Sequence, residues 1–555
     1  NMKKILYIIL ACNILFSCQD INLLPKESLS DPLFWKTQND FKTAANYLYN
    51  IALDGYNTSY TLDYNSDICY ALNANAESNG SWIALDSDPD WDNAYKYIRN
   101  ANIIIEKYDS YNGDKSEIDR YKAEARFFRA YQYWKLVKRF GDVPLITKVL
   151  NVDSEELMGK RNSRIEVEDF ILQELQEITS YLPLQNELQD IDKGRITSGA
   201  AWALRARASL FFGTWAKYHK HRNDINYLLE QAIISARKVI DSHQYGLFEE
   251  KGNDSYRYLF IEAGDDSKED ILSSRYYQNI RTHNASSLFA WGWNGTPTRK
   301  MADMYLCKDG LPIDKSSLFK GYQTINSEFE NRDPRMSQTF LIPGTLYTDF
   351  EQGKPITECP PKFSDRPETR TGYKLWKFIG EEKTQDTQAT YDYHIIRYAE
   401  VLLILAEATY EKDGYISDDV LNETINVLRS RTGINMPALT NSFAEKYQLN
   451  ILTEIRRERC VELAFEGFRR DDLRRWKTAE KELKEPIKGI MYKGSEYETL
   501  NVLNSGNPGL TDEDGFLIVE PESERHFDAN KHYLYSIPLM QLYLNPNLLP
   551  NNPGW

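Results

Sequence analysis

Apolar residues recur at helical spacing over two long parts of this chain of 555 residues. In the range 197–218, Ala201, Leu204, Ala208, Phe211 and Trp215 are three or four positions apart, which places them on one face of a helix. The same spacing predicts further helices over the ranges 34–48, 91–105, 125–138, 166–181, 228–241, 393–412 and 418–431. The pattern therefore predicts a mainly α fold.

The predicted helices follow one another as pairs. The ranges 166–181 and 197–218 are separated by Pro183 and a polar turn, and their alanines alternate with aromatic residues. Antiparallel helix pairs of roughly 34 residues are typical of tetratricopeptide-like hairpins, although the strict signature of that repeat is absent here. We expect a scaffold of such hairpin repeats over about residues 30–245 and 390–480.

Helical periodicity is lost in two regions. Residues 52–92 are rich in Asp, Asn, Ser and Tyr, and residues 245–390 are rich in Gly, Pro, Asn and Asp with alternating aromatics. Segments this long without regular structure of their own are commonly functional. We expect the range 245–390 to be an irregular recognition segment with short strands, inserted in the scaffold, and residues 480–555 to form a C-terminal segment.

Tryptophans in these regions stand beside glycine and asparagine, a context that is unusual for a helix core. Such neighbours let an indole project and supply amide groups for hydrogen bonding, as sugar recognition requires. The alternative is that each indole anchors its loop on the core. The candidate ligand-binding residues are Trp82, Trp291, Trp293, Asn65, Asp67 and Asn79.

A charged stretch, residues 455–476, alternates Arg and Glu with apolar residues at helical spacing. Gly467 is a plausible end for one helix, and Asp471 and Asp472 could cap a second. The stretch could be catalytic or a structural ion-pair network, because such networks resemble active sites. With no catalytic partners elsewhere, we interpret it as a buried or half-buried network formed by Arg456, Arg459, Glu462, Glu466 and Arg469.

The N-terminus has the pattern of an export signal. Lys3 and Lys4 precede an apolar run of about a dozen residues, too short to span a bilayer. Leu15-Phe16-Ser17-Cys18 resembles a bacterial lipobox, so we expect residues 1–17 to be a lipoprotein signal peptide and Cys18 to be lipidated. The alternative is a plain secretory signal. We expect the scattered Cys69, Cys307, Cys359 and Cys460 to be mostly buried free thiols.

Charge and composition narrow the range of functions. A net charge of −15 argues against a nucleic-acid partner, which requires a basic face. No zinc-protease, hydrolase or phosphate-loop motif is present, and no cofactor is indicated. The run Asp86, Asp88, Asp90 and Asp92 lacks the glycine and glutamate of a calcium loop, so we interpret it as a helix-capping acidic loop. A carboxylate pair of a glycosidase cannot be recognised from sequence.

A resemblance extends over nearly the whole chain after residue 17. The motifs that carry it are, in order, the lipobox at Cys18, Trp91-x-x-x-Tyr95-x-x-Ile98-x-x-Ala101-Asn102, Phe140-Gly141-Asp142-Val143-Pro144-Leu145, Asp333-Pro334-Arg335-Met336, Gly372-Tyr373-Lys374, Ile396-Arg397-Tyr398-Ala399-Glu400-Val401-Leu402-Leu403, the charged stretch, Ile537-Pro538, Asn545-Pro546-Asn547 and Asn552-Pro553-Gly554-Trp555. Together they resemble the SusD/RagB family of outer-membrane glycan-binding lipoproteins of Bacteroidetes.

The resemblance implies an α-helical, non-enzymatic protein with four tetratricopeptide-like hairpins. It also implies a lipid-anchored position on the cell surface, and a SusC-like TonB-dependent transporter to which an oligosaccharide is delivered. Some members of the family serve peptides or other ligands, and a pure protein-interaction scaffold is a further alternative. A glycoside hydrolase is the remaining alternative. The aromatic platforms that the family places on variable loops correspond best to Trp82, Trp291 and Trp293.

Overall fold

The computed structural model describes residues 34–56, 60–290, 295–348, 355–357, 369–381, 387–503 and 509–555. The predicted signal segment 1–17, Cys18, Trp291, Trp293 and Cys359 lie outside these ranges. Of the other cysteines, Cys69, Cys307 and Cys460 are buried free thiols, which confirms the prediction for these three. No helix in the described ranges is both long enough and apolar enough to cross a membrane.

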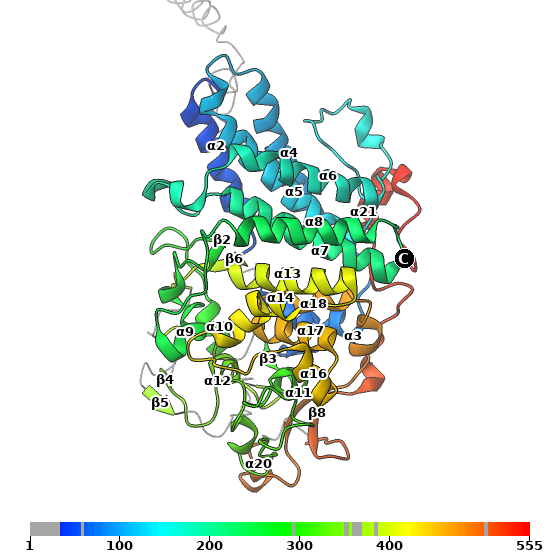
Figure 1. Cartoon of the computed structure of the whole chain (residues 1–555). Coiled ribbons are helices and arrows are strands. Elements are labelled where there is room, and N and C mark those ends of the chain that lie inside the picture. The colour runs from blue at the N-terminus through cyan, green and yellow to red at the C-terminus, as the bar shows by residue number, and fades with distance from the viewer. Residues whose placement is uncertain are drawn as a thin grey trace, which may run out of the picture.

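Stacked helices form one half of the molecule, shown in blue to green and yellow in Figure 1. Consecutive helices pack in pairs, α4 on α5, α5 on α6, α6 on α7 and α7 on α8, and α13 then packs on α8. The helices are α2 (Gln38–Ile51), α4 (Pro89–Asp109), α5 (Asp119–Phe140), α6 (Arg164–Glu177), α7 (Ser198–His219), α8 (Ile225–Ile240) and α13 (Tyr398–Asp413). The mainly α prediction is confirmed.

Local sequence signals set the ends of these helices. Asp88 caps α4 by accepting from the backbone of Asp90, and Pro89 occupies the first helical position. The acidic run at 86–92 is therefore a helix-capping loop, as interpreted. Ser163 forms a capping box with Glu166 at the start of α6. Gly141, with a φ of 72°, ends α5.

Two predicted helices differ from the structure. Tyr393–Arg397 is strand β6, which pairs antiparallel with β2 (Asp270–Ser274), and α13 begins only at Tyr398. All residues of β6 are buried, so the strand has no exposed face, and its sequence lacks the alternation of apolar and polar residues that would distinguish it from a helix. The predicted helix 418–431 is broken at Thr424 into α14 (Asp418–Glu423) and α15 (Ile425–Ser430).

The two helices of the charged stretch have other terminal residues than predicted. α17 spans Ile451–Glu462 and has Leu463 as its C-cap, so Gly467 lies in the turn that follows. α18 spans Arg469–Arg475, with Phe468 at the N-cap position and Asp471 and Asp472 inside its first turn. These two acids do not cap the helix because their side chains are used in ion pairs, Asp471 with Lys138 and Asp472 with Arg459.

The remaining chain forms the irregular half, which carries short two-stranded ladders. They pair β1 (Cys69–Tyr70) with β3 (Thr296–Pro297), β4 (Leu346–Thr348) with β5 (Pro355–Thr357), and β7 (Ile487–Met491) with β8 (Phe516–Glu520). The short helices there are α3 (Ala76–Asn79), α9 (Ser255–Tyr258), α10 (Ala285–Ala290), α11 (Arg299–Met304), α12 (Pro334–Thr339), α16 (Asn441–Tyr447), α19 (Ala479–Glu482), α20 (Glu496–Thr499) and α21 (Leu539–Leu544).

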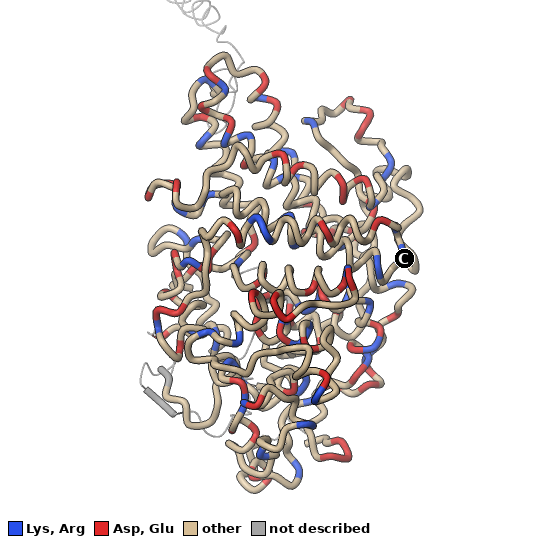
Figure 2. The backbone as a smooth tube through the Cα atoms, in the orientation of Figure 1, with Lys and Arg blue, Asp and Glu red and all other residues tan. Residues whose placement is uncertain are grey.

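Acidic and basic residues are interspersed along both halves (Figure 2). Many of them are buried rather than exposed, and the largest fully buried side chains include Arg335, Arg397, Arg429 and Arg431. A buried arginine is tolerated only when it is paired and hydrogen-bonded. The interior of the irregular half is therefore organised by ion pairs as well as by apolar packing.

Candidate functional site

The β1–β3 ladder joins the two loop regions in which ligand-binding residues were predicted. Tyr70 pairs with Thr296 and Cys69 with Pro297. Thr298 extends the contact, because its backbone N–H donates to the carbonyl of Ile68 at 3.0 Å and its hydroxyl donates to the carbonyl of Asp67 at 2.7 Å. The loop 60–82 thus contacts residues 296–298 of the second predicted loop region.

Gly295 makes this close approach feasible. Its φ of 125° is a conformation that residues with a side chain rarely adopt, and a Cβ at this position would overlap the sulfur of Cys69. Next to it, the Tyr70 side chain is half-buried, and burial raises the pKa of its hydroxyl to about 12. Arg370 donates from Nε to the carbonyl of Leu72 at 3.3 Å, so it also contacts the loop that carries β1.

Sequence reasoning did not identify Tyr70 or Arg370. A two-residue strand gives no periodic signal, and the approach of Arg370 to Leu72 joins positions 298 residues apart. Both residues belong to the loops around β1 and β3, so they are additional candidates for ligand contact. The only signal in the sequence was the enrichment of tyrosine in the loop region.

The three predicted polar residues form hydrogen bonds or ion pairs within the protein. Asp67 is buried and accepts two bonds from Arg469, at 2.8 and 2.7 Å. Burial alone would raise the pKa of Asp67, but the charge and hydrogen bonds of Arg469 lower it below its usual value. Asn65 donates to Glu77 at 2.9 Å, and Asn79 accepts from the backbone of Ser81 at 3.0 Å. All three residues therefore stabilise the loop that carries Trp82.

Trp82 packs against aromatic residues of the C-terminal segment. Its ring centroid lies 4.0 Å from that of His532, 5.6 Å from Tyr535 and 6.1 Å from Trp555. The half-buried indole also lines a pocket of about 320 Å³ together with Glu77, Asp88 and Arg139. Its Nε1–H is buried and has no hydrogen-bond partner in the described structure. Trp82 is thus both a loop anchor and one wall of a pocket.

The charged stretch forms the predicted network. Glu462 accepts from Arg335 at 2.9 Å, from Arg397 at 2.8 Å and from Arg431 at 3.2 Å. Burial alone would raise the pKa of Glu462, but these three guanidinium groups lower it to about 2. The other predicted members are also buried or half-buried and paired: Arg456 with Glu411, Arg459 with Asp472, Glu466 with Arg397 and Lys377, and Arg469 with Asp67.

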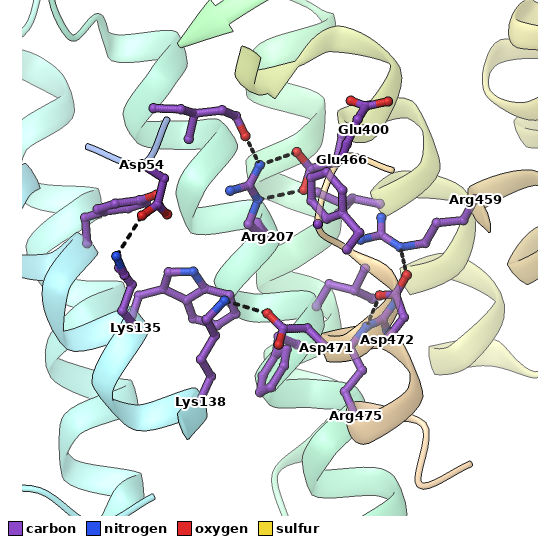
Figure 3. Close-up of a pocket in the computed structure, with 18 of the residues that line it drawn as sticks. Asp54, Lys135, Lys138, Arg207, Glu400, Arg459, Glu466, Asp471, Asp472 and Arg475 are labelled. Carbon is purple, nitrogen blue, oxygen red and sulfur yellow. Dashed lines mark hydrogen bonds and ion pairs between the residues drawn. The ribbon is translucent and has the colours of Figure 1, made fainter. Parts of the chain in front are cut away.

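A small cavity of about 70 Å³ lies beside this network, between α5, α7, α13 and α18 (Figure 3). Lys135 points to Asp54, Lys138 to Asp471 and Arg459 to Asp472, so the labelled cations are held by carboxylates. A volume of this size accommodates a few water molecules and no sugar ring. Within the described residues, no cluster of His, Cys, Asp or Glu could hold a metal ion.

Asp63 is a carboxylate with a raised pKa that is not placed for acid–base chemistry. Burial raises the pKa of Asp63 to about 7, yet its oxygens accept from the backbone N–H groups of Gly467, at 2.9 Å, and Arg469, at 3.2 Å. Asp63 is fully buried, so a ligand in the loops around β1 and β3 cannot reach it. Its position supports the turn that joins α17 to α18.

Comparison with known proteins agrees with this architecture. SusD-like protein P2 of Formosa agariphila is 25% identical over 579 residues, covering 100% of this chain and 99% of that protein. A SusD-like carbohydrate-binding protein of Bacteroides fragilis has a similar structure, with a TM-score of 0.77, 24% identity, and coverage of 93% of this chain and 100% of that one. A second SusD-like protein of that species gives a TM-score of 0.74 at 25% identity, covering 95% and 99%.

Family models divide the chain into two matched parts. Residues 36–210 match a family described as starch-binding associating with outer membrane, and these residues include α2 through most of α7. Residues 259–555 match the SusD family, and they include β3, the charged network and α21. Because this second match covers more than half of the chain, the chain belongs to the SusD family.

Proposed function

We propose that this protein is a non-enzymatic cell-surface protein that binds an oligosaccharide and delivers it to a SusC-like TonB-dependent outer-membrane transporter. Membership of the SusD family carries the proposal. A B. fragilis structure with a TM-score of 0.77 is described as a carbohydrate-binding protein, and its chain matches this one over its full length. Glycan binding is thus the function that the comparisons support best.

The loops around β1 and β3 are the proposed glycan site. The ladder pairs Tyr70 with Thr296, and Gly295 directly follows in sequence the segment 291–294, which contains Trp291 and Trp293. Indole and phenol rings offer flat apolar faces to sugar rings, with polar edges for the hydroxyl groups. Asn65, Asp67 and Asn79 support this site by fixing the loop in place, and Trp82, at the end of the same loop, is a separate aromatic candidate in its own pocket.

The charged network supports a binding function rather than hydrolysis. A glycosidase requires a carboxylic acid with a raised pKa and a second carboxylate on opposite sides of the scissile bond. In the network, Glu462 and Glu466 have lowered pKa values and are held by arginines and Lys377. They remain ionised at neutral pH and have no free access to a ligand.

Membrane attachment is proposed through Cys18. The matched family is described as associating with the outer membrane. A lipid anchor at the N-terminus of the mature chain would attach the protein to the membrane without a spanning helix, because multiple acyl chains give stable anchoring. Metabolic labelling with a fatty-acid analogue would detect this modification, and Cys18→Ser would abolish the label.

Glycan screening of the chain from Gln19 onward tests the proposed function. Affinity electrophoresis in gels containing plant, microbial and host polysaccharides is expected to retard the protein in at least one gel. The same polysaccharides incubated with the protein are expected to release no reducing ends. Absence of retardation in all gels would favour a peptide ligand or a protein-interaction scaffold, and sugar release would favour a hydrolase.

A further inference from the structure

A cavity of about 490 Å³ lies between α11, β7 and β8. α11 follows β3 in the chain and packs on β7, the partner of β8, in the lower part of Figure 1. Asp67 and Thr298, which a hydrogen bond joins beside the β1–β3 ladder, also line the cavity. Ligand-binding pockets commonly have volumes of about 300–1,000 Å³. The cavity is therefore large enough for a ligand, and the ladder fixes one of its walls.

Two half-buried aromatic rings form another wall of the cavity. The ring centroids of Tyr322 and Phe516 are 5.2 Å apart, and the rings are nearly perpendicular, at 82°. The guanidinium of Arg299 lies 4.3 Å from the Tyr322 centroid and 4.6 Å from the Phe516 centroid. Arg299 is itself held by Glu328, at 2.9 Å, and by Asp303. The rings are thus fixed before a ligand binds, which lowers the entropic cost of binding.

Ion pairs line the cavity next to these rings. Lys300 is paired with Glu482 at 2.5 Å and with Glu485 at 3.0 Å. Burial alone would lower the pKa of Lys300, but the carboxylates of Asp67 and Glu482 raise it above its usual value, so the ammonium stays charged. The side chains of Lys300, Glu485 and Asp303 are 31, 44 and 39% exposed. They therefore offer a ligand charged donors and acceptors that the ion pairs hold in place.

A second cavity, of about 480 Å³, adjoins the first. The two cavities share Lys300, Asp303 and Glu482, and we call them together the α11 groove. Arg457 of α17 lines the second cavity and donates from Nη1 to the carbonyl of Asp303 at 3.4 Å. This contact attaches α11 to α17 across the groove. The α11 groove is thus longer than one compact pocket, which suits a chain-shaped ligand.

The composition of the α11 groove favours a neutral oligosaccharide. Sugar hydroxyl groups both donate and accept hydrogen bonds, so they match a wall that contains carboxylates and cations together. The faces of sugar rings are apolar, so they match the rings of Tyr322 and Phe516. Five carboxylates and three cations line the first cavity, so an anionic ligand would be repelled.

Other ligand classes fit the α11 groove less well. An apolar ligand would remove water from Lys300, Glu485 and Asp303 without replacing their hydrogen bonds, which is costly. A cationic ligand would have to compete with Lys300 and Arg299, which already pair with the carboxylates. A neutral ligand with many hydroxyl groups avoids both costs.

We propose that the α11 groove is a second carbohydrate-binding site, which binds a neutral oligosaccharide by stacking on Phe516 and by hydrogen bonds to Glu485 and Lys300. The inference rests on the proposed function, because that function supplies carbohydrate as the class of ligand. It adds a second site on the same protein. A polysaccharide long enough to contact this site and the loops around β1 and β3 together would be held more tightly than by either site alone.

Titration calorimetry on the chain from Gln19 onward tests the inference once the loop site is disabled by Trp291→Ala/Trp293→Ala. Maltohexaose, cellohexaose and xylohexaose are the neutral probes, and at least one of them is expected to bind this double variant. Phe516→Leu keeps an apolar side chain but removes the flat ring, and Glu485→Gln removes a charge. Added to the double variant, each is expected to weaken the remaining binding about tenfold.

Two substitutions elsewhere are the matched controls. Phe170→Leu changes a half-buried phenylalanine of α6, and Glu423→Gln changes a glutamate of α14 that is 38% exposed and paired with Arg237. Both are expected to leave binding of the probes unchanged. Thermal melts show whether each variant folds. Independently of the groove variants, hydrogen–deuterium exchange of peptides covering residues 482–491 is expected to slow when a probe binds the double variant.

Several results would overturn the inference. Binding of the probes by the wild type but not by the double variant would remove the second site and leave the proposed function intact. Unchanged affinity in Phe516→Leu and Glu485→Gln, or unchanged exchange at residues 482–491, would do the same. If neither protein bound any probe, the inference would fail, and the gel screen would decide separately on the proposed function.

Two further probes address the other ligand classes. Tighter binding of hexagalacturonate than of any neutral probe to the double variant would overturn the inference in favour of an anionic ligand. Binding of spermidine that is lost in Glu485→Gln would overturn it in favour of a cationic ligand. The expected result is that neither probe binds at the α11 groove.

Discussion

Arg469 on α18 forms a two-bond ion pair with Asp67, a residue 402 positions earlier in the loop before β1. The two distances are 2.8 Å from Nε to Oδ1 and 2.7 Å from Nη2 to Oδ2. The carbonyl of Asp67 accepts from Thr298, so the pair connects the charged stretch to the β1–β3 ladder. The charged network thus supports the loops at which we propose that glycan binds.

Asp67→Ala is expected to lower the free energy of unfolding by about 3–5 kcal/mol, because it leaves the Arg469 guanidinium buried and unpaired. Chemical denaturation measures this change. Asp190→Ala is the control, since that carboxylate is 96% exposed, and it is expected to have little effect. If Asp67→Ala abolished glycan binding at unchanged stability, Asp67 would be a ligand-contacting residue and not a structural one.

Glu462→Ala is expected to lower the Tm while leaving glycan affinity per folded molecule unchanged. Three arginines would lose a shared carboxylate in a buried site, which costs several kcal/mol. Thermal melts and titration calorimetry on the folded fraction measure the two quantities. Glu445→Ala, at an exposed position of α16, serves as the control. A selective loss of affinity without destabilisation contradicts the structural role.

Acid sensitivity follows from the same residue. The pKa of Glu462 falls from an ordinary value of 4.5 to about 2 in the folded protein. A carboxylate with a lowered folded pKa stabilises the fold above its unfolded pKa, and that stability is lost as the pH falls from about 4.5 toward 2. Denaturation in urea between pH 6 and 3 is expected to show a smaller loss of stability for Glu462→Ala than for the wild type. Parallel curves for the two proteins would exclude this contribution.

Gly295→Ala is expected to destabilise the protein by about 1–3 kcal/mol and to weaken glycan binding. The added Cβ would overlap the Cys69 sulfur in a backbone conformation that alanine rarely adopts, so the β1–β3 ladder would shift. Gly246→Ala is the matched control, because a Cβ there meets no atom within 4 Å. Calorimetry and denaturation on both variants test the prediction, and wild-type behaviour of Gly295→Ala would contradict it.

Periodicity along the chain predicted the helical scaffold well, because α2, α4 and α8 bury one face and α2, α4, α6 and α7 begin at a capping side chain. Periodicity failed at β6, because a strand that is buried on both faces cannot be distinguished from a buried helix by its sequence pattern. The sequence predicted which residues of the charged stretch belong to the network. It could not predict their partners, such as Asp67 and Arg397, because these come from distant parts of the chain. The packing of Trp82 against His532 and Trp555 was not predictable for the same reason.

The outward face of α21 was also not predicted. The residues Leu539–Leu544 form an ordinary apolar segment in the sequence, and only the structure shows that Leu542 packs against the core while Leu539, Met540, Tyr543 and Leu544 are exposed. Trp291 and Trp293 stay predictions, since they lie outside the described residues.

Titration calorimetry with a glycan from the screen, on the wild type and on Trp291→Ala and Trp293→Ala, tests the central claim most directly. Trp202→Ala, a half-buried tryptophan on α7 in the scaffold, is the control. By analogy with base stacking on aromatics, each lost stack is expected to weaken binding by about 1–3 kcal/mol while the fold stays intact. Wild-type affinity in both loop variants would contradict glycan binding at the loops around β1 and β3.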